Sequence, residues 1–231
     1  MELSNETPRQ LFHKLRETTR HRRYGAGRKP MLVNVDLQCA YSQVGQYVTA
    51  YETDPRQIDY VNELAALARM ADLPVYWTYV AFREDGLDCG PFGSRDDTPD
   101  SLQNIKRGSQ RATLDPRITL GPNDHVINKL MPSAFFETNL QSLMVWTRCD
   151  TLVVTGGSTS GCVRATVVDG LSRGYRVIVP EECVADLHES PHFANLYDMH
   201  KKYADVLPVS DVLEYYRRLV AEKDSIPKTG T

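Results

Sequence analysis

A β-branched apolar run leads into a loop of small residues in the stretch Val153-Val154-Thr155-Gly156-Gly157-Ser158-Thr159-Ser160-Gly161-Cys162-Val163-Arg164. The pattern predicts a strand over 151–155, a turn, and a helix over 162–172 that begins at Cys162. The unpaired N–H groups and the positive dipole end of a helix N-terminus lower the pKa of a thiol. Because a thiolate is a nucleophile, we interpret Cys162 as catalytic, with a buried packing cysteine as the alternative. An activated Cys162 should react with iodoacetamide well below about pH 8.5.

Short apolar runs alternate with helical patterns from Pro30 onward. Residues 83–124 are rich in Gly, Pro, Asp and Ser and predict a long irregular loop, which in a compact domain is usually functional. The alternation predicts a single-domain, three-layer α/β/α fold with a mainly parallel sheet and Rossmann-like topology. The expected strands span 31–36, 74–80, 125–128, 151–155, 175–179 and 205–207, and the expected helices span 56–70, 139–147, 162–172, 191–203 and 211–220.

Length and composition limit the classes of protein. The 231 residues, 41% of them hydrophobic, predict one domain over 30–222, with an N-terminal arm over 1–29 and a C-terminal tail over 223–231. The basic arm is expected to pack on the surface or on a neighbouring subunit. A net charge of −3 and the lack of a long apolar run argue against nucleic-acid and membrane partners. The five scattered cysteines form no CxxC and predict reduced thiols in the cytoplasm.

Ionisable residues follow three of the expected strands: Asp36, Lys129 and Cys162. Each of them alone is more often a cap, a surface charge or a core thiol. Because the carboxyl ends of parallel strands meet at one edge of a sheet, we expect the three side chains to lie together. Together they supply what a cysteine amidohydrolase needs: a base for the thiol proton, a cation beside the base, and a nucleophile.

The chain resembles the isochorismatase-like cysteine hydrolases, and most of all their N-carbamoylsarcosine amidase branch. The resemblance implies that Asp36, Lys129 and Cys162 form a catalytic triad. It also implies a cis peptide bond between Gly157 and Ser158, which directs the Ser158 and Cys162 N–H groups at one oxyanion. Relatives form dimers and tetramers, so a homo-oligomer is expected. The resemblance covers roughly residues 30–215 and is carried by Asn34-Val35-Asp36-Leu37-Gln38, Asn128-Lys129-Leu130-Met131-Pro132-Ser133-Ala134-Phe135, the stretch from Thr155 to Arg164, and Asn195-Leu196-Tyr197-Asp198.

The implied reaction hydrolyses a C–N bond of a small amide or ureido substrate with water, through a thioester, and releases ammonia. Some nicotinamidases of the wider family bind a metal through an Asp-x-His motif. The region 79–89 of this chain contains no histidine and no such motif. We therefore expect no metal and no cofactor, and a nicotinamidase is less favoured. The alternatives are a maleamate amidohydrolase and a catalytically silent binding member of the family. The vinyl ether hydrolysis of isochorismatase itself is disfavoured, since that reaction does not need a thioester.

The residues proposed to bind substrate are Tyr41, Gln43, Arg107 and Leu187. Tyr41 lies about one helical turn after Asp36, where relatives often have an aromatic wall. In carboxylate-binding members of the branch, the Arg of a Gly-Asp-Arg after the fifth strand holds the substrate carboxylate. The matching stretch here is Ala185-Asp186-Leu187, and leucine cannot pair with a carboxylate. A neutral urea such as biuret or triuret therefore fits better, unless Arg107 replaces the missing cation.

Further polar residues have weaker patterns. Arg111 lies in the long loop, like Arg107, and either reaches a polar substrate or is solvated. His188, His192 and His200 flank the start of an expected helix. For these histidines we predict surface or capping roles.

Overall fold

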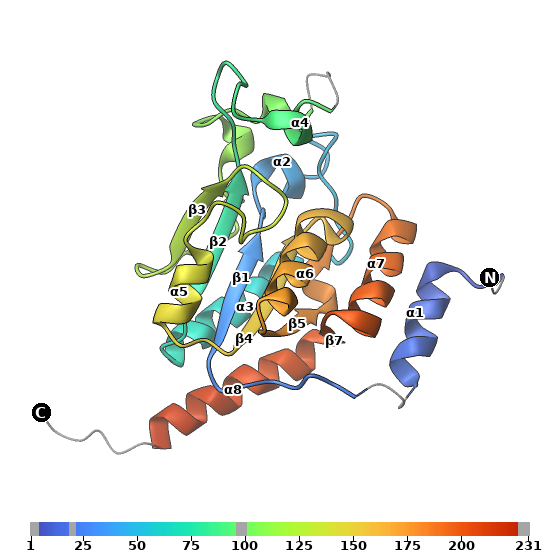
Figure 1. Cartoon of the computed structure of the whole chain (residues 1–231), viewed down its shortest axis with the longest axis vertical. Coiled ribbons are helices and arrows are strands. Elements are labelled where there is room, and N and C mark those ends of the chain that lie inside the picture. The colour runs from blue at the N-terminus through green and yellow to red at the C-terminus, as the bar shows by residue number, and fades with distance from the viewer. Residues whose placement is uncertain (1–4, 19–21, 96–100, 226–231) are drawn as a thin grey trace, which may run out of the picture.

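The computed structural model describes residues 5–18, 22–95 and 101–225 (Figure 1). In this part of the chain seven parallel strands form one sheet in the order β3-β2-β1-β4-β5-β7, with the short β6 beside β4. The chain builds outward in both directions from β1 and β4, so the switch point of a doubly wound sheet lies between these two strands. The strands span Pro30–Val35 (β1), Val75–Val80 (β2), His125–Lys129 (β3), Thr151–Gly157 (β4), Arg176–Pro180 (β5), Val184–Ala185 (β6) and Asp205–Leu207 (β7).

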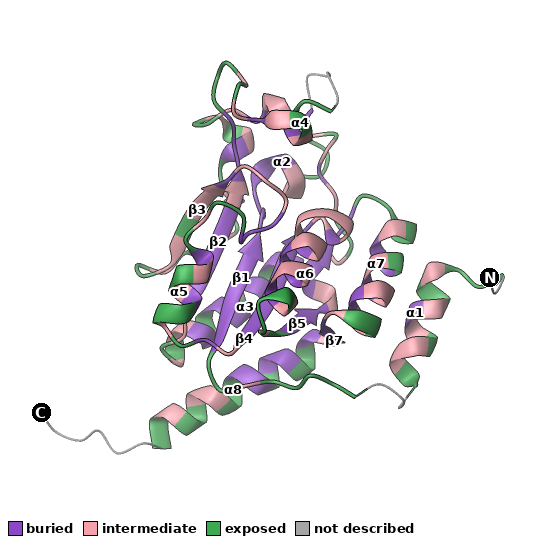
Figure 2. Cartoon of the chain, viewed as in Figure 1, coloured by how far each residue is buried: buried purple, intermediate pink, exposed green. Residues whose placement is uncertain are grey.

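Hydrophobic side chains alternate across the sheet and fill two cores. Val33 and Val154 pack in one core with α5, α6 and α7, whereas Leu32 and Val153, which pair in the register of β1 and β4, pack in the other with α3 and α8. Figure 2 shows the buried strands enclosed by helices of mixed burial. Because helices cover both faces, every residue of the central strands β1 and β4 is buried. The helices span Gln57–Met70 (α3), Leu140–Trp146 (α5), Arg164–Ser172 (α6), Glu189–Lys202 (α7) and Val209–Ser225 (α8).

The three-layer α/β/α fold with a mainly parallel sheet, predicted from the sequence, is confirmed. Two details differ. The helix expected to begin at Cys162 begins at Arg164, after a π-helical turn over Thr159–Val163. The hydrophobic pattern also did not predict α2 (Cys39–Ser42) or β6, because these elements are too short to show a hydrophobic period.

The described residues of the long segment, 83–95 and 101–124, are mostly irregular, as predicted; the part around α4 lies at the carboxyl ends of the strands, at the top of Figure 1, and the end of the segment returns to the start of β3. Backbone hydrogen bonds tie it to the end of β2: Phe82 N–H donates to Ile105 O at 2.8 Å, and Arg107 N–H donates to Phe82 O at 2.9 Å. The described part of the segment therefore covers the edge of the sheet where the predicted site lies. Its helical pieces are α4 (Gly90–Gly93), η1 (Leu102–Asn104) and η2 (Gln110–Ala112).

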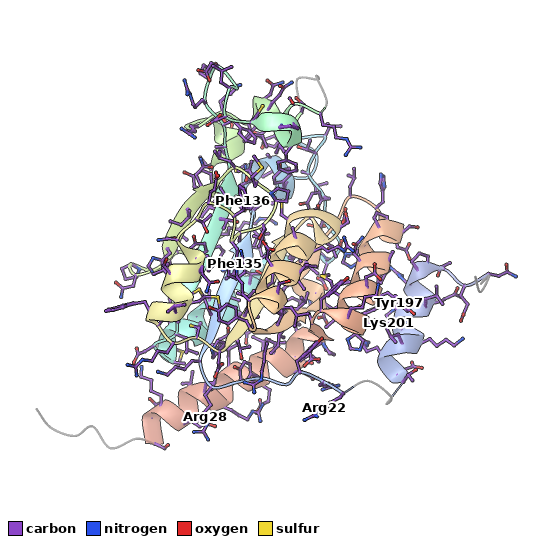
Figure 3. All side chains as sticks on the ribbon, in the orientation of Figure 1. Arg22, Arg28, Phe135, Phe136, Tyr197 and Lys201 are labelled. Atoms are coloured by element: carbon purple, nitrogen blue, oxygen red, sulfur yellow. The ribbon has the colours of Figure 1, made fainter. Side chains whose placement is uncertain are left out.

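The N-terminal region contains a helix that the sequence analysis missed, α1 (Pro8–Glu17), which packs against α7 through the fully buried Phe12. Residues 22–29 lead into β1, with Arg22 and Arg28 along them in Figure 3. Parts of the proposed arm and tail, residues 1–4, 19–21 and 226–231, lie outside the described residues. Within the described residues, none of the helices combines the length and apolar character that crossing a membrane requires.

Candidate active site

The side chains of Asp36, Lys129 and Cys162 meet at the carboxyl edge of the sheet. Asp36 directly follows β1, Lys129 ends β3, and Cys162 lies in the π-helical turn after β4. The Lys129 ammonium nitrogen lies 2.7 Å from Asp36 Oδ2 and 3.3 Å from Cys162 Sγ. The Lys129 and Asp36 side chains are both fully buried. Buried charges are stable when they are paired, and here the Lys129 ammonium pairs with the Asp36 carboxylate and also contacts the Cys162 sulfur.

Local contacts orient the Asp36 carboxylate. Asp36 has a φ of 53°, in the left-handed region that an L-residue adopts only where surroundings require it. The Thr78 hydroxyl donates to Asp36 Oδ1 at 2.7 Å, and Lys129 donates to Met131 O at 3.1 Å. Oδ2 faces the ammonium but receives no well-directed hydrogen bond from a described residue. It is therefore the oxygen best placed to take a proton from the neighbouring thiol.

The pKa of Cys162 differs from the sequence-based prediction. Burial raises it to about 12; the Lys129 charge opposes this rise and Asp36 adds to it. This direction is opposite to the low thiol pKa expected from the sequence, because the thiol is buried beside a carboxylate and α6 begins only at Arg164. Cys162 therefore rests as a thiol and needs a base. Burial lowers the pKa of Lys129, but the Asp36 carboxylate and the hydrogen-bonding contacts of Lys129 with Asp36 and Cys162 outweigh this effect and raise it.

The loop before Cys162 has the expected cis peptide bond and one N–H group that the described backbone leaves unpaired. The peptide bond between Gly157 and Ser158 is cis, and the Ser158 N–H has no hydrogen-bond acceptor among the described residues. Gly156 has a φ of 105°, and a β-carbon added there would lie 1.9 Å from Val35 O. Only glycine fits at this position, so β4 approaches the end of β1 closely enough to bring the loop beside Asp36.

Side chains from three other segments hold this loop. The Gln57 amide donates to Gly156 O at 3.1 Å, and Asp186 accepts the Ser160 N–H at 2.7 Å. The Thr159 hydroxyl lies 2.9 Å from His192 Nδ1. His192 is only 2% exposed, so the predicted surface or capping role is wrong for this histidine. The sequence could not reveal the contact, because it joins α7 to a loop more than thirty positions away.

The burial of His192 makes the stability of the protein depend on pH. Burial lowers the pKa of His192 to about 4, opposed by Asp186 and assisted by Arg9. The unfolded chain takes up this proton near pH 6.5 and the folded chain only near pH 4, so folding stability falls as the pH drops between these values. We expect the titration of His192 to lower the unfolding free energy by up to about 3 kcal/mol as the pH falls from about 6.5 to about 4.

Substituting His192→Gln should reduce the fall in unfolding free energy between pH 7.5 and pH 5, measured by urea denaturation. The exposed His188→Gln is the matched control and should show the wild-type difference between the two pH values. An unchanged pH dependence in His192→Gln would show that this histidine does not cause it.

A cavity of about 570 Å³ opens beside the nucleophile. Its wall is mainly apolar, its polar groups are hydroxyls and backbone, and no residue in it from the described chain is an acid, a lysine, an arginine or a histidine. This composition suits a small molecule without net charge. The lining residues are Tyr41, Val48, Thr49, Tyr51, Val80, Phe92, Ser101, Leu102, Ile105, Pro132, Gly157, Ser158, Gly161 and Cys162.

The structure brings only one of the predicted substrate-binding residues to the cavity, Tyr41. Arg107 pairs with Asp88 at 2.6 Å and does not line it. Leu187 is 54% exposed and also lies outside the lining, because Asp186 turns inward to the loop and Leu187 turns outward. Gln43 is likewise absent from the lining, and its Oε1 is buried without a hydrogen-bond partner among the described residues.

The sequence analysis missed Tyr51, Phe92 and Ile105 in the cavity wall. They lie on irregular segments whose path cannot be read from hydrophobic periodicity. The structure also has no group of three or more His, Cys, Asp or Glu side chains positioned to hold a metal ion, as far as its described residues extend.

Comparison with known proteins gives one consistent family. The Isochorismatase domain matches residues 30–211. An N-carbamoylsarcosine amidase from an Arthrobacter species is 34% identical over 215 residues, which cover 90% of this chain and 79% of that protein. A maleamate amidohydrolase from Pseudomonas putida is 34% identical over 200 residues, which cover 85% of this chain and 91% of that protein.

Solved structures agree on the fold. A cysteine hydrolase from Pseudomonas syringae pv. phaseolicola superposes with a TM-score of 0.78 at 20% identity, covering 85% of this chain and 97% of that one. The domain match spans most of the sequence, and both relatives match over most of their length. The resemblance seen in the sequence is thereby confirmed, and the chain belongs to the isochorismatase family of hydrolases.

Proposed function

We propose that the protein is a cysteine amidohydrolase that hydrolyses a C–N bond of a small, uncharged ureido or carbamoyl compound and releases ammonia. The observation that carries the proposal is the Lys129 ammonium between the Asp36 carboxylate and the Cys162 thiol, at 2.7 and 3.3 Å, beside a cavity. The names of the relatives, an amidase and an amidohydrolase, support hydrolysis of a C–N bond.

In the proposed mechanism Asp36 takes the thiol proton, and the sulfur of Cys162 forms a bond to the substrate carbonyl carbon. The carbonyl oxygen becomes an oxyanion that accepts hydrogen bonds from the Ser158 and Cys162 N–H groups. The C–N bond then breaks, and Asp36 returns its proton to the nitrogen, which leaves as ammonia. Water hydrolyses the remaining thioester and regenerates the thiol. Lys129 stays protonated throughout and balances the negative charge that passes between carboxylate and sulfur.

The cavity wall supports an uncharged substrate. A carboxylate enclosed there would lose its hydration, and no described lining residue offers it a cation. Burying an unpaired charge in this way costs several kcal/mol, on the order of the desolvation penalty of one ion. This argument replaces the one based on Leu187, since that side chain lies outside the cavity. A ureido group, by contrast, is polar, planar and neutral.

Maleamate hydrolysis is the second candidate, because the Pseudomonas putida relative has that name. Its carboxylate would need a cation, and Arg107 is already paired with Asp88. Arg111, whose positive charge acts on the Tyr41 phenol, is the arginine it would have to recruit. A catalytically silent role is disfavoured, because Asp36, Lys129 and Cys162 are all present and in contact.

Ammonia release from a panel of substrates tests the proposal. The panel holds biuret, triuret, N-carbamoylsarcosine, other N-carbamoyl amino acids, maleamate and nicotinamide. We expect kcat/KM for biuret or triuret to exceed that for the carboxylates by at least about tenfold. This ratio corresponds to a free-energy cost of about 1.4 kcal/mol for placing an unpaired charge in the cavity. Higher kcat/KM for a carboxylate substrate would contradict the neutral-substrate claim while retaining the amidohydrolase.

A further inference from the structure

The Tyr51 hydroxyl lies beside the proposed oxyanion site. A β-carbon added to Gly157 would lie 2.2 Å from the Tyr51 hydroxyl oxygen, so this oxygen packs directly over the residue that precedes Ser158. Tyr51 also lines the cavity together with Cys162. A substrate whose carbonyl carbon contacts the sulfur would therefore place its neighbouring atoms within reach of this phenol.

The ring of Tyr51 is held in place. It stacks on Tyr41 with ring centroids 6.0 Å apart and an interplanar angle of 25°, and the Tyr51 N–H donates to Tyr41 O at 3.0 Å. Its position is therefore set by the protein and does not depend on the ligand. A donor fixed in this way contributes more to recognition than one that must be ordered on binding.

Some hydroxyl groups of the cavity already form hydrogen bonds within the protein, and others do not. Thr49 donates its hydroxyl to Ala40 O at 2.6 Å, and the Ser101 hydroxyl accepts a hydrogen bond from Asn104 at 3.2 Å. The phenols of Tyr41 and Tyr51, in contrast, make no hydrogen bond to a described residue, and it is the Tyr51 hydroxyl that packs over Gly157. A half-buried hydroxyl that faces a cavity without a partner is placed to bind a polar atom of a ligand.

The electrostatic surroundings make this phenol a donor. Burial raises the pKa of Tyr51 well above its usual value, and the negative charge of Asp36 raises it further. The phenol therefore keeps its proton wherever the enzyme is folded and working. The group that it binds must present an acceptor, and in a cavity whose described lining contains no cation a neutral carbonyl oxygen fits best.

Resting on the proposed function, we propose that Tyr51 is a specificity-determining residue that donates a hydrogen bond to a second carbonyl oxygen of the substrate. The substrate class is then an N-acyl or N-carbamoyl urea. In such a molecule one carbonyl receives the sulfur, and the other lies one nitrogen away in the same planar group. The first oxygen is bound by the Ser158 and Cys162 N–H groups and the second by Tyr51.

The test compares two neutral substrates of similar size in wild type and Tyr51→Phe. Biuret, or triuret if the wild type prefers it, carries a second carbonyl, and N-propylurea does not. We expect Tyr51→Phe to lower kcat/KM for the two-carbonyl substrate about tenfold. This is the loss expected when one hydrogen bond is removed and the second carbonyl oxygen of the substrate is left unpaired. For N-propylurea we expect a change below about twofold; if it is not hydrolysed, its inhibition constant against the two-carbonyl substrate replaces kcat/KM.

Tyr47→Phe is the matched control, since Tyr47 lies on the same segment but does not line the cavity, and it should change neither value. An equal effect of Tyr51→Phe on both compounds, or none, would overturn the assignment while ammonia release still supports the amidohydrolase. Wild-type turnover of one-carbonyl or carboxylate substrates alone would also overturn it. Release of ammonia from no compound would instead overturn the proposed function, and the assignment with it.

Discussion

Substituting Cys162→Ser should abolish ammonia release, with kcat lowered by about 10⁴-fold or more. A serine hydroxyl is a far weaker nucleophile than a thiol, and its much higher pKa leaves Asp36 unable to remove its proton efficiently. The substitution changes one atom in a side chain that is partly buried beside Lys129, 3.3 Å away. We therefore expect the variant to fold and to show the loss in initial rates of ammonia release at saturating substrate.

Cys149→Ser is the control for this experiment. Cys149 is buried at the amino end of β4, where its sulfur lies 3.1 Å from the Thr147 hydroxyl, and it has no contact with the site. This variant should retain activity within about twofold, as expected for a substitution that touches no reacting group. A Cys162→Ser enzyme with more than about a tenth of wild-type activity would contradict the claim that the sulfur of Cys162 is required to attack the substrate.

The variant Asp36→Asn should separate two properties that wild type combines. Hydrolysis should fall by about 10² to 10⁴-fold, because the amide cannot take the thiol proton or return it to the leaving nitrogen. Alkylation should change in the opposite direction. The negative charge of Asp36 raises the pKa of Cys162, so removing that charge lowers it. Iodoacetamide should then modify Cys162 faster at pH 7.5 in the variant, as followed by mass spectrometry.

Asp72→Asn provides a matched control for this change. Asp72 has a φ of 54°, close to the 53° of Asp36, but lies in the exposed turn between α3 and β2. Because the backbone conformations match, any effect of asparagine in the left-handed region is common to both variants. Wild-type hydrolysis and alkylation are expected for Asp72→Asn. Slower alkylation of Asp36→Asn than of wild type would contradict the electrostatic role given to Asp36.

The fold and the residues of the central contact could be predicted from the sequence for one physical reason. Each of Asp36, Lys129 and Cys162 ends or follows a segment whose apolar residues predict a strand, and parallel strands bring their carboxyl ends to one edge. The switch point between β1 and β4 then places Asp36 next to the Cys162 loop. Periodicity and topology therefore carry this information without any knowledge of side-chain packing.

The rest of the site depends on tertiary contacts that periodicity does not record. Tyr51 reaches the cavity from an irregular segment, and His192 reaches Thr159 from a helix distant in sequence. Leu187 matched a ligand-binding position of the family, yet its side chain is exposed, because its neighbour Asp186 binds the Ser160 N–H. The direction of the thiol pKa shift was also missed, since burial beside a carboxylate outweighs the benefit of a nearby helix start.

Partitioning by hydroxylamine tests the covalent mechanism most directly. Wild-type enzyme is incubated with its best ureido substrate in neutral hydroxylamine, and ammonia and the hydroxylamine product are measured together. A thioester on Cys162 predicts that hydroxylamine captures the acyl group, so that the hydroxamate or N-hydroxyurea forms at the expense of the hydrolysis product while ammonia is still released. Ammonia release with no hydroxylamine product at any concentration would contradict a Cys162 thioester and indicate direct attack by water.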